Sequence, residues 1–293
     1  MHRFFKITPV LFILISVILL VTTNVYAANK TLIFSAIPDQ NQSQLNKRFS
    51  KVAVYLSQRL GVPVKYIPVK SYTAAITAFR NSQVHLAWFG GLSGVRARAL
   101  VENSEAIAQG IEDTQFETYF IAHHSTKLQS SSKFPSGIEG KNFTFGSKGS
   151  TSGRLMPEYY IREYFNKKPA EIFNRVGFSG NHSRTIALVQ SGAYQVGAVN
   201  YKVWQKEIAN GNIDLNKLNV IWKTPSYPDY QWTVRGDVDI HWGQGFKMKI
   251  KKALTEMNDP ELLGVFPRSA FIEAKNSDYL PILNTAKKIG LME

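Results

Sequence analysis

Two polar segments of this 293-residue sequence combine residue types that could bind an anion. The first is the loop GSKGSTSG at 146–153, in which Ser150, Thr151 and Ser152 supply hydroxyl donors. The second is the turn SGNH at 179–182, which ends in His182. Each segment lies between an expected strand and an expected helix. Because a helix start carries free N–H groups and a partial positive charge, the two segments predict a site for a small tetrahedral oxyanion.

The residues alone also permit a plainer interpretation of both segments. The Ser/Gly loop could be an ordinary helix cap with a flexible surface segment, and a lone histidine such as His182 often has a structural role. Further candidates lie at strand ends, in turns or in the Pro-rich segment 224–230: Trp88 and Phe89, which could line the site or belong to the core, and more weakly Asp39, Tyr72, Tyr227, Asp229 and Tyr230. The glycines Gly90 and Gly91 could present one more helix start to a ligand.

Signatures of catalysis are missing from the sequence. It contains no phosphate-binding loop, no dinucleotide fingerprint, no serine elbow and no HExxH zinc motif. The adjacent residues His123 and His124 would point to opposite faces of a strand, so we expect no metal and no cofactor. The sequence has no cysteine, which excludes disulfides, cysteine-ligated metals, thiol nucleophiles and a lipid anchor.

The candidate residues are placed by an alternation of strands and helices. Strands are expected at 31–37, 62–69, 85–89, 118–123, 141–145, 175–178, 195–200 and 220–223. Helices are expected at 45–60, 72–80, 157–166, 183–190 and near 246–257, and one more runs from the segment 90–94 through residue 100. This alternation of strands and helices predicts an α/β fold of parallel sheets with helices on both faces, in two Rossmann-like lobes joined by a hinge. Lobe 1 would comprise 28–120 plus 225–293 and lobe 2 would comprise 121–224, with a crossing at the Pro-rich segment 224–230. Ligands of such sheets bind beyond the carboxyl ends of the strands, where the two anion segments lie.

The first 27 residues read as an export signal. A basic head is followed by the apolar run at 10–21 and by the small-residue pattern Val25-Tyr26-Ala27. A run of this length is too short to span a bilayer, although an uncleaved anchor is the alternative. Cleavage after Ala27 would leave 266 of the 293 residues and, because Arg3 and Lys6 would be removed, would reduce the net charge from +14 to +12. We expect a soluble periplasmic protein.

The positive charge favours an anionic partner without naming one. Lys247, Lys249, Lys251 and Lys252 are clustered on an expected helix. With no helix-turn-helix and no aromatic-studded basic surface, we interpret them as a solvated face and expect no nucleic acid. We expect a monomer.

The sequence resembles a type II periplasmic binding protein, because it combines an export signal, two α/β lobes and two segments suited to binding an anion. The sequence resembles the phosphonate/phosphite-binding components of ABC transporters and, within that family, the branch labelled selenate-binding. The segments that carry this resemblance are SAIPDQ, SYTAAITAFRNSQVHLAWFGGLSG, GSTSGRLMPEYY, FSGNHSRTIALV and IWKTPSYPDYQWTVR. The resemblance implies an oxyanion held by Ser150, Thr151, Ser152 and His182. It also implies that aromatic residues of lobe 1, here Tyr72, Trp88 and Phe89, lie across the cleft.

Two departures from the family pattern bear on the ligand. Ser183 stands where phosphonate binders often have an acidic residue after the histidine, and Asp229 is offset from the acid in the crossing segment, beside Tyr230. The loops are therefore rich in donors and poor in acids, which disfavours aminoalkylphosphonates. A fully ionised sulfate or selenate suits a site made of donors, whereas a protonated phosphonate or phosphite also needs an acceptor, which Asp39 or Asp229 could supply.

The resulting hypothesis is a binding protein that closes two lobes around an oxyanion and delivers it to an ABC permease driven by an ATPase. The alternatives are a secreted hydrolase of phosphorylated compounds and a periplasmic sensor domain of the same fold. A hydrolase would need a nucleophile and a base, or a metal, in the cleft.

Overall fold

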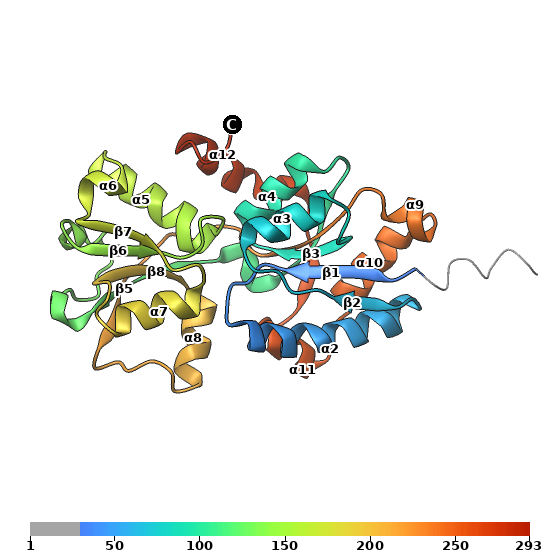
Figure 1. Ribbon diagram of the computed structural model, residues 1–293, viewed down its shortest axis with the longest axis horizontal. Coiled ribbons are helices and arrows are strands. Elements are labelled where there is room, and N and C mark those ends of the chain that lie inside the picture. The colour runs from blue at the N-terminus through green and yellow to red at the C-terminus, as the bar shows by residue number, and fades with distance from the viewer. Residues whose placement is uncertain (1–29) are drawn as a thin grey trace, which may run out of the picture.

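The computed structural model describes residues 30–293, and the expected signal at 1–27 lies outside this range. The chain forms two α/β lobes side by side, each built on its own sheet (Figure 1). Within 30–293, no helix combines the length and apolar character required to cross a membrane. The two-lobed α/β fold expected from the sequence is confirmed.

The sheet of the first lobe has six strands in the order β11-β4-β10-β3-β1-β2. Their bounds are β1 Leu32–Ala36, β2 Val64–Tyr66, β3 Leu86–Phe89, β4 Glu105–Gly110, β10 Gln231–Val234 and β11 Phe271–Glu273. β1 runs parallel to β2 and β3, as the alternating pattern predicts. β10 is antiparallel to β3 and β4, because the chain returns from the second lobe at the carboxyl edge and must run back through the sheet. The sheet is therefore mixed and not parallel throughout.

Helices cover the first sheet with their apolar faces inward. They are α2 Gln42–Leu60, α3 Tyr72–Arg80, α4 Gly91–Leu100, η1 Ile111–Gln115, α9 Val238–Trp242, α10 Phe246–Thr255, α11 Pro260–Val265, η5 Asn276–Tyr279 and α12 Leu280–Lys288. In α2, the side chains spaced as expected for a helix are buried, and the helix ends at Gly61, whose φ of 70° suits glycine. Ser71 caps α3 by accepting the N–H of Ala74, as expected.

The sheet of the second lobe has five strands in the order β7-β6-β8-β5-β9. The elements are β5 Thr118–His123, η2 His124–Thr126, η3 Ser136–Ile138, β6 Asn142–Phe145, η4 Thr151–Leu155, α5 Met156–Phe165, α6 Pro169–Ile172, β7 Arg175–Phe178, α7 His182–Gln190, β8 Val196–Asn200, α8 Tyr201–Ala209 and β9 Leu218–Lys223. β6 is parallel to β7 and β8, while β5 is antiparallel to β8 and β9. All of β5 belongs to this sheet, so the first crossing precedes Thr118, whereas we expected lobe 1 to extend to residue 120. The rest of the proposed lobe boundaries stays a prediction.

The two segments that join the sheets run antiparallel beside each other. Phe116 and Tyr227 exchange backbone hydrogen bonds of 2.8 and 3.0 Å, and the N–H of Asp229 donates to the carbonyl of Asp113 at 2.9 Å. These paired segments are where a hinge between the lobes would bend.

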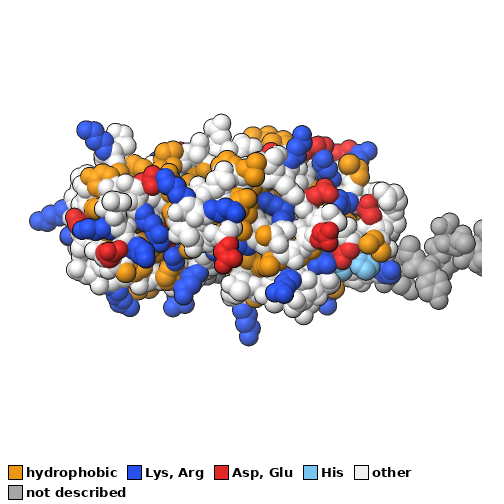
Figure 2. All heavy atoms as spheres, turned by 90° about the horizontal axis from the view of Figure 1, so that it is seen from above, with side chains coloured by type: hydrophobic (Ala, Val, Ile, Leu, Met, Phe, Trp, Pro, Cys, Tyr) orange, Lys and Arg blue, Asp and Glu red, His pale blue; other side chains and the backbone are white. Residues whose placement is uncertain are grey.

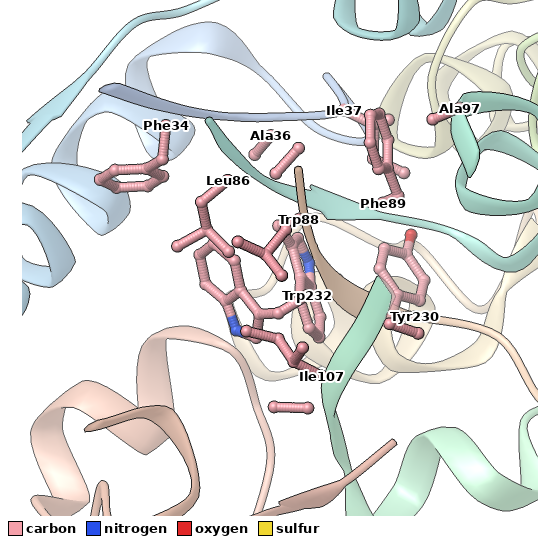
Figure 3. Packing of buried hydrophobic residues seen from close by; sticks show 14 of the residues in the cluster. Phe34, Ala36, Ile37, Leu86, Trp88, Phe89, Ala97, Ile107, Tyr230 and Trp232 are labelled. Carbon is pink, nitrogen blue, oxygen red and sulfur yellow. The ribbon is translucent and has the colours of Figure 1, made fainter. Parts of the chain in front are cut away.

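An aromatic cluster fills the first lobe next to the crossing. Trp88 on β3 stacks on Tyr230 at a ring distance of 5.4 Å and contacts Trp232 at 5.3 Å (Figure 3). The crossing segment is thus packed against the core strand that leads toward the second lobe.

The basic helix α10 is less solvated than expected. Lys247 and Lys251 form ion pairs with Glu105 and Glu273, and Lys249 donates to the carbonyl of Leu60 at 2.6 Å. These lysines fasten α10 to the first lobe, although Lys252 remains mostly exposed.

Candidate ligand cleft

The second lobe contributes the Ser/Gly loop, which starts the π-helical turn η4. Ser150 caps this turn by accepting the N–H of Gly153 at 2.9 Å. Ser150, Thr151 and Ser152 are almost fully buried, at 2%, 1% and 1% exposure. The Ser152 hydroxyl is buried without a hydrogen-bond partner among residues 30–293. The loop is therefore no flexible surface segment, and Ser152 keeps a donor available.

Gly153 allows a close approach of the loop to His182. A Cβ on Gly153 would lie 3.1 Å from the Cα of Gly146 and 3.1 Å from Cε1 of His182. A larger residue would therefore push the imidazole away from the loop.

His182 is the first residue of α7 and is completely buried. Its Nδ1 accepts the backbone N–H of Asn200 at 3.3 Å, while Nε2 has no partner among the described residues. Burial lowers the pKa of His182 to about 4, against a smaller opposing effect of Asp39. The imidazole is thus neutral at pH 7, and because Nδ1 is an acceptor, its proton sits on Nε2. His182 presents one N–H donor.

The first lobe contributes Tyr72 and Asp39. Tyr72 opens α3, is 1% exposed, and its hydroxyl has no hydrogen-bond partner within 30–293. Asp39 follows β1 in a turn, where its carbonyl accepts the N–H of His182 at 3.0 Å. Its Oδ2 accepts from the Tyr230 hydroxyl at 3.0 Å, and Oδ1 is buried without a partner in the described chain. Tyr230 in turn accepts from the Asn200 amide at 2.9 Å, so both lobes are linked across the cleft.

Asp229, in the crossing segment, lies at the start of α4 together with Thr151. Its Oδ1 accepts the N–H of Gly91 at 2.7 Å, and Thr151 Oγ1 accepts the N–H of Leu92 at 3.0 Å. Burial raises the pKa of Asp229 to about 7, against the opposing effects of Thr151 and the Gly91 N–H. The idea that Gly90-Gly91 offers these N–H groups to a ligand is wrong in this conformation, because Asp229 and Thr151 already take them. Asp229 Oδ2 is buried and unpaired in the described chain.

Tyr227 lies behind the Ser/Gly loop. Its hydroxyl is 2.5 Å from the hydroxyl of Thr118, which donates to the carbonyl of Ser152 at 2.9 Å. Tyr227 thus supports the backbone at Ser152 from the crossing segment, and burial raises its pKa well above the ordinary range.

Trp88 and Phe89 occupy different surroundings. Trp88 lies at the mouth of the cleft beside Tyr230, whereas Phe89 is fully buried and packs edge-on against Phe79 at 5.6 Å. The contacts of Phe89 are those of a core residue, and its contact with a ligand stays a prediction.

Sequence reasoning missed Asn200 and Thr118. Asn200 links the lobes through Tyr230 and caps α8 by accepting the N–H groups of Lys202 and Val203. Its place between a strand and a helix is the same signal that identified Ser150, so it could have been found. Thr118 carries no such signal, because it is simply the first residue of β5.

The lobes are closed over these groups. At the mouth remains a cavity of about 10 Å³, lined by Asp39, Gln40, Arg48, Trp88, Asn200, Lys202, Val203, Tyr230, Phe266, Pro267 and Arg268. Hydrogen bonds join the two lobes through Asp39, His182, Tyr230 and Asn200. Among the candidate residues, five buried polar atoms have no partner within 30–293: Tyr72 OH, Ser152 Oγ, His182 Nε2, Asp39 Oδ1 and Asp229 Oδ2. Because unpaired buried polar groups are costly, this arrangement is suited to holding a polar ligand.

Comparison with known proteins shows the family of this chain. Residues 34–279 match the family model of the ABC transporter, phosphonate, periplasmic substrate-binding protein. The chain belongs to this family. It is 41% identical over 277 residues to the probable ABC transporter phosphite binding protein PhnD1 of Prochlorococcus marinus strain MIT 9301, covering 91% of this chain and 92% of the relative.

Solved structures show the same fold. The structure of PhnD1 from Prochlorococcus marinus in complex with methylphosphonate superposes with a TM-score of 0.85 at 40% identity, covering 90% of this chain and 99% of that one. A binding protein component of an ABC phosphonate transporter from Pseudomonas aeruginosa reaches a TM-score of 0.78 at 21% identity, covering 88% and 85%.

Family membership decides between the alternatives left by the sequence. The protein is a periplasmic substrate-binding component of an ABC importer, whose partners are a permease and an ATPase, and it is not an enzyme. The hydrolase and sensor interpretations are therefore not favoured.

Proposed function

We propose that this protein captures a small protonated oxyanion of the phosphonate or phosphite class between its lobes and delivers it to the importer's permease. The observation that carries the proposal is that five buried polar atoms, contributed by both lobes and by the crossing segment, have no hydrogen-bond partner among residues 30–293. The names of its relatives support it, since one is a phosphite binding protein and one structure holds methylphosphonate.

Three of the five atoms are hydrogen-bond donors to the ligand. Ser152 and His182 donate from the second lobe and Tyr72 from the first. A buried oxyanion needs nearly every oxygen hydrogen-bonded, and donors on both lobes satisfy it only when the cleft is closed. The ligand therefore stabilises the closed conformation in proportion to its contacts with both lobes. Ser150 and Thr151 hold the loop and the α4 start in place, and Trp88 and Tyr227 support the two walls.

The other two atoms are carboxylate oxygens, which select the class of oxyanion. Asp39 and Asp229 need a hydrogen-bond donor, and hydrogen phosphite or a phosphonate monoanion carries an O–H that can supply it. Sulfate and selenate at neutral pH offer acceptors only, so they would face the unpaired Asp39 oxygen and, wherever Asp229 is ionised, a second carboxylate oxygen. Since the pKa of Asp229 is about 7, one proton can be shared between this carboxyl and the ligand.

The ligand preference expected from the loops alone changes once the acids outside them are included. The loops are poor in acids, and our proposal adds Asp39 and Asp229 from elsewhere in the chain, which accept hydrogen bonds from Tyr230 and from the Gly91 N–H. We therefore place selenate below phosphite and methylphosphonate as a ligand.

Calorimetric titration of the mature, ligand-stripped protein tests this function. The panel is phosphite, methylphosphonate, 2-aminoethylphosphonate, sulfate and selenate. Phosphite or methylphosphonate should bind at least tenfold more tightly than sulfate or selenate. Tightest binding of selenate or sulfate would overturn the role of the carboxylates, and tightest binding of 2-aminoethylphosphonate would assign them to an ammonium group. If a folded sample binds none of the five compounds, the proposed ligand class is overturned.

We further propose that the exported protein begins at Ala28 and acts as a monomer. Intact mass of the periplasmic protein and sedimentation equilibrium test these two points. A mass that retains residues 1–27, or a stable dimer at micromolar concentration, would contradict them.

A further inference from the structure

A second hollow lies at the boundary of the lobes, outside the cleft. It has a volume of about 510 Å³ and is lined by Arg96, Phe145, Lys148, Arg154, Glu158, Arg162, Lys168, Pro169, Ala170, Val176, Phe178 and Leu291. We call it the boundary groove. Figure 2 views the molecule from the side of α12, on which blue Lys and Arg side chains lie over the second lobe and near the lobe boundary.

The rim of the boundary groove is strongly cationic. Five of its lining residues are Lys or Arg, and its one acid, Glu158, is 1% exposed and already paired with Arg154 and Arg162. In the described part of the chain, the side-chain nitrogens of Arg96, Lys148 and Lys168 form no ion pair, although Glu171 accepts the backbone N–H of Lys168 at 2.9 Å. The groove therefore carries positive charge that the protein itself does not neutralise.

Closure of the lobes assembles this charge. Arg96 is on α4 of the first lobe and Arg154 on η4 of the second, and the two elements touch through the hydrogen bond from Leu92 N–H to Thr151. Burial lowers the pKa of Arg96, and the nearby charge of Arg154 lowers it further. The C-terminal tail also spans the boundary, since Arg96 donates to the carbonyl of Leu291 at 2.7 Å and Arg162 to that of Ile289 at 3.1 Å. Like charges from two lobes are thus brought together, and an acidic group between them would offset their repulsion.

The floor of the groove is apolar and partly exposed. Phe178 is 38% exposed, with the Arg154 guanidinium 4.7 Å and the Lys148 ammonium 5.2 Å from its ring centre. Val176, Pro169 and Leu291 complete the apolar lining. An occupant that fits both floor and rim has an apolar side chain flanked by carboxylates.

We propose that the boundary groove docks an acidic, apolar-anchored segment of the importer's permease, and that only the closed protein presents it in full. This inference rests on the proposed function, because the permease is the partner that must distinguish the loaded protein from the open one. By linkage, a segment that binds Arg96 and Arg154 together favours closure as the ligand does.

The observations favour a protein segment over the other anionic occupants. A single small oxyanion would fill little of the 510 Å³ and would gain nothing from the apolar floor. A flat anionic membrane would meet the exposed Lys148 and Lys168, but it would not reach the half-buried Arg96 between the lobes. A protruding acidic segment can reach all three.

The test uses the mature protein and its purified permease–ATPase complex in lipid nanodiscs. R96E/K168E removes one groove cation from each lobe, and K47E/K65E makes the same change of charge at exposed lysines of α2 and β2. With protein loaded with methylphosphonate, the concentration for half-maximal stimulation of ATP hydrolysis should rise at least tenfold for R96E/K168E and less than twofold for K47E/K65E. Equal effects of the two pairs, or none, would overturn the docking site. Calorimetry should show no loss of methylphosphonate affinity in either variant, because R96E replaces a repulsion that opposes closure with an attraction. Failure of the parent to bind any member of the panel would instead overturn the proposed function.

A crosslinking experiment detects the contact directly, with the protein loaded with methylphosphonate. The photoreactive substitution Phe178→p-benzoylphenylalanine should crosslink to the permease in these nanodiscs, at a peptide rich in Asp and Glu. The same substitution at Ile240, which is 82% exposed on α9, is the matched control and should not crosslink. Crosslinking to lipid in nanodiscs without the permease, equal capture from both positions, or no capture from Phe178 would overturn the proposal.

Discussion

The two walls of the cleft are built on different principles. The second-lobe wall presents Ser152 and His182, polar residues at helix starts that no packing requirement explains. The first-lobe wall contains Tyr72 and Trp88, aromatic residues that also belong to the hydrophobic core of that lobe. A buried polar side chain at a helix start that leaves an atom without a partner therefore points to a binding role, whereas a buried aromatic residue such as Tyr72, whose hydroxyl is also unpaired within 30–293, serves packing and binding at once.

Burial also suppresses ionisation of opposite sign on the two sides of the cleft, that of a histidine and that of a carboxyl group. Burial lowers the pKa of His182 to about 4 and raises that of Asp229 to about 7. The second lobe thus offers a neutral donor, and the crossing segment offers a carboxyl that can hold or accept a proton.

Removing the donors of the second-lobe wall should have the largest effect. His182→Ala and Ser152→Ala should each weaken ligand binding by at least tenfold, because a hydrogen bond to a charged group contributes about 1.5–3 kcal/mol. Calorimetry with phosphite and methylphosphonate measures the change. His85→Ala is the matched control, since His85 lies in the first lobe and accepts the Ile33 N–H at 3.1 Å. Unchanged affinity in both cleft variants would show that Ser152 and His182 do not bind the ligand.

Changing the acceptor of the other wall should alter selectivity. Asp229→Asn replaces a carboxyl with an amide whose N–H group suits a fully ionised oxyanion, so the ratio of phosphite to sulfate affinity should fall at least tenfold. Competition titrations with phosphite, sulfate and selenate measure this ratio. Asp237→Asn, at an acid remote from the cleft and paired with Arg235, should leave it unchanged. A parental ratio in Asp229→Asn would show that this carboxyl does not face the ligand.

The two walls should respond oppositely to pH. Asp229 is protonated in the native protein up to about pH 7 but ionises near 3.8 when unfolded, so its contribution to stability is lost as pH rises through this window. His182 titrates near 4 when native and near 6.5 when unfolded, so stability is lost as pH falls below 6.5. Each slope can approach about 1.4 kcal/mol per pH unit.

Urea unfolding of the ligand-free protein between pH 4 and 8 measures both slopes. The free energy of unfolding of the parent relative to Asp229→Asn should fall with rising pH, and that relative to His182→Gln should rise. Two difference curves of the same sign would contradict the assigned protonation states.

Much of the fold could be predicted because local patterns were strong. The helical spacing of Leu45, Phe49 and Val52 and the cap at Ser71 lie within or beside helices found by the structure. The strands β4, β10 and β11 were missed, and the expected strand at 62–69 shortens to β2. β10 follows a crossing from the other lobe, so its pairing depends on contacts distant in sequence.

The site was predictable to the extent that its residues follow strands. Ser152 and His182 follow adjacent parallel strands, whose carboxyl ends meet at one edge of the sheet. The role of Asp39 depends instead on Tyr230, 191 residues away along the chain, and no local pattern reveals that hydrogen bond. Tertiary pairing thus decides which acids reach the cleft.

The smallest expected effect on binding concerns Phe89, the aromatic residue set deepest in the first-lobe wall. Phe89→Leu should lower the free energy of unfolding by about 1 kcal/mol, because the edge-on contact with Phe79 is lost, while the affinity for phosphite changes less than twofold. Trp88→Leu is the comparison, since Trp88 stacks on Tyr230 and lies at the mouth, and it should weaken both stability and binding. A tenfold loss of affinity in Phe89→Leu at unchanged stability would instead place its ring against the ligand, as the family resemblance implies. The pair therefore measures how far the ligand-contacting surface extends into the core of the first lobe.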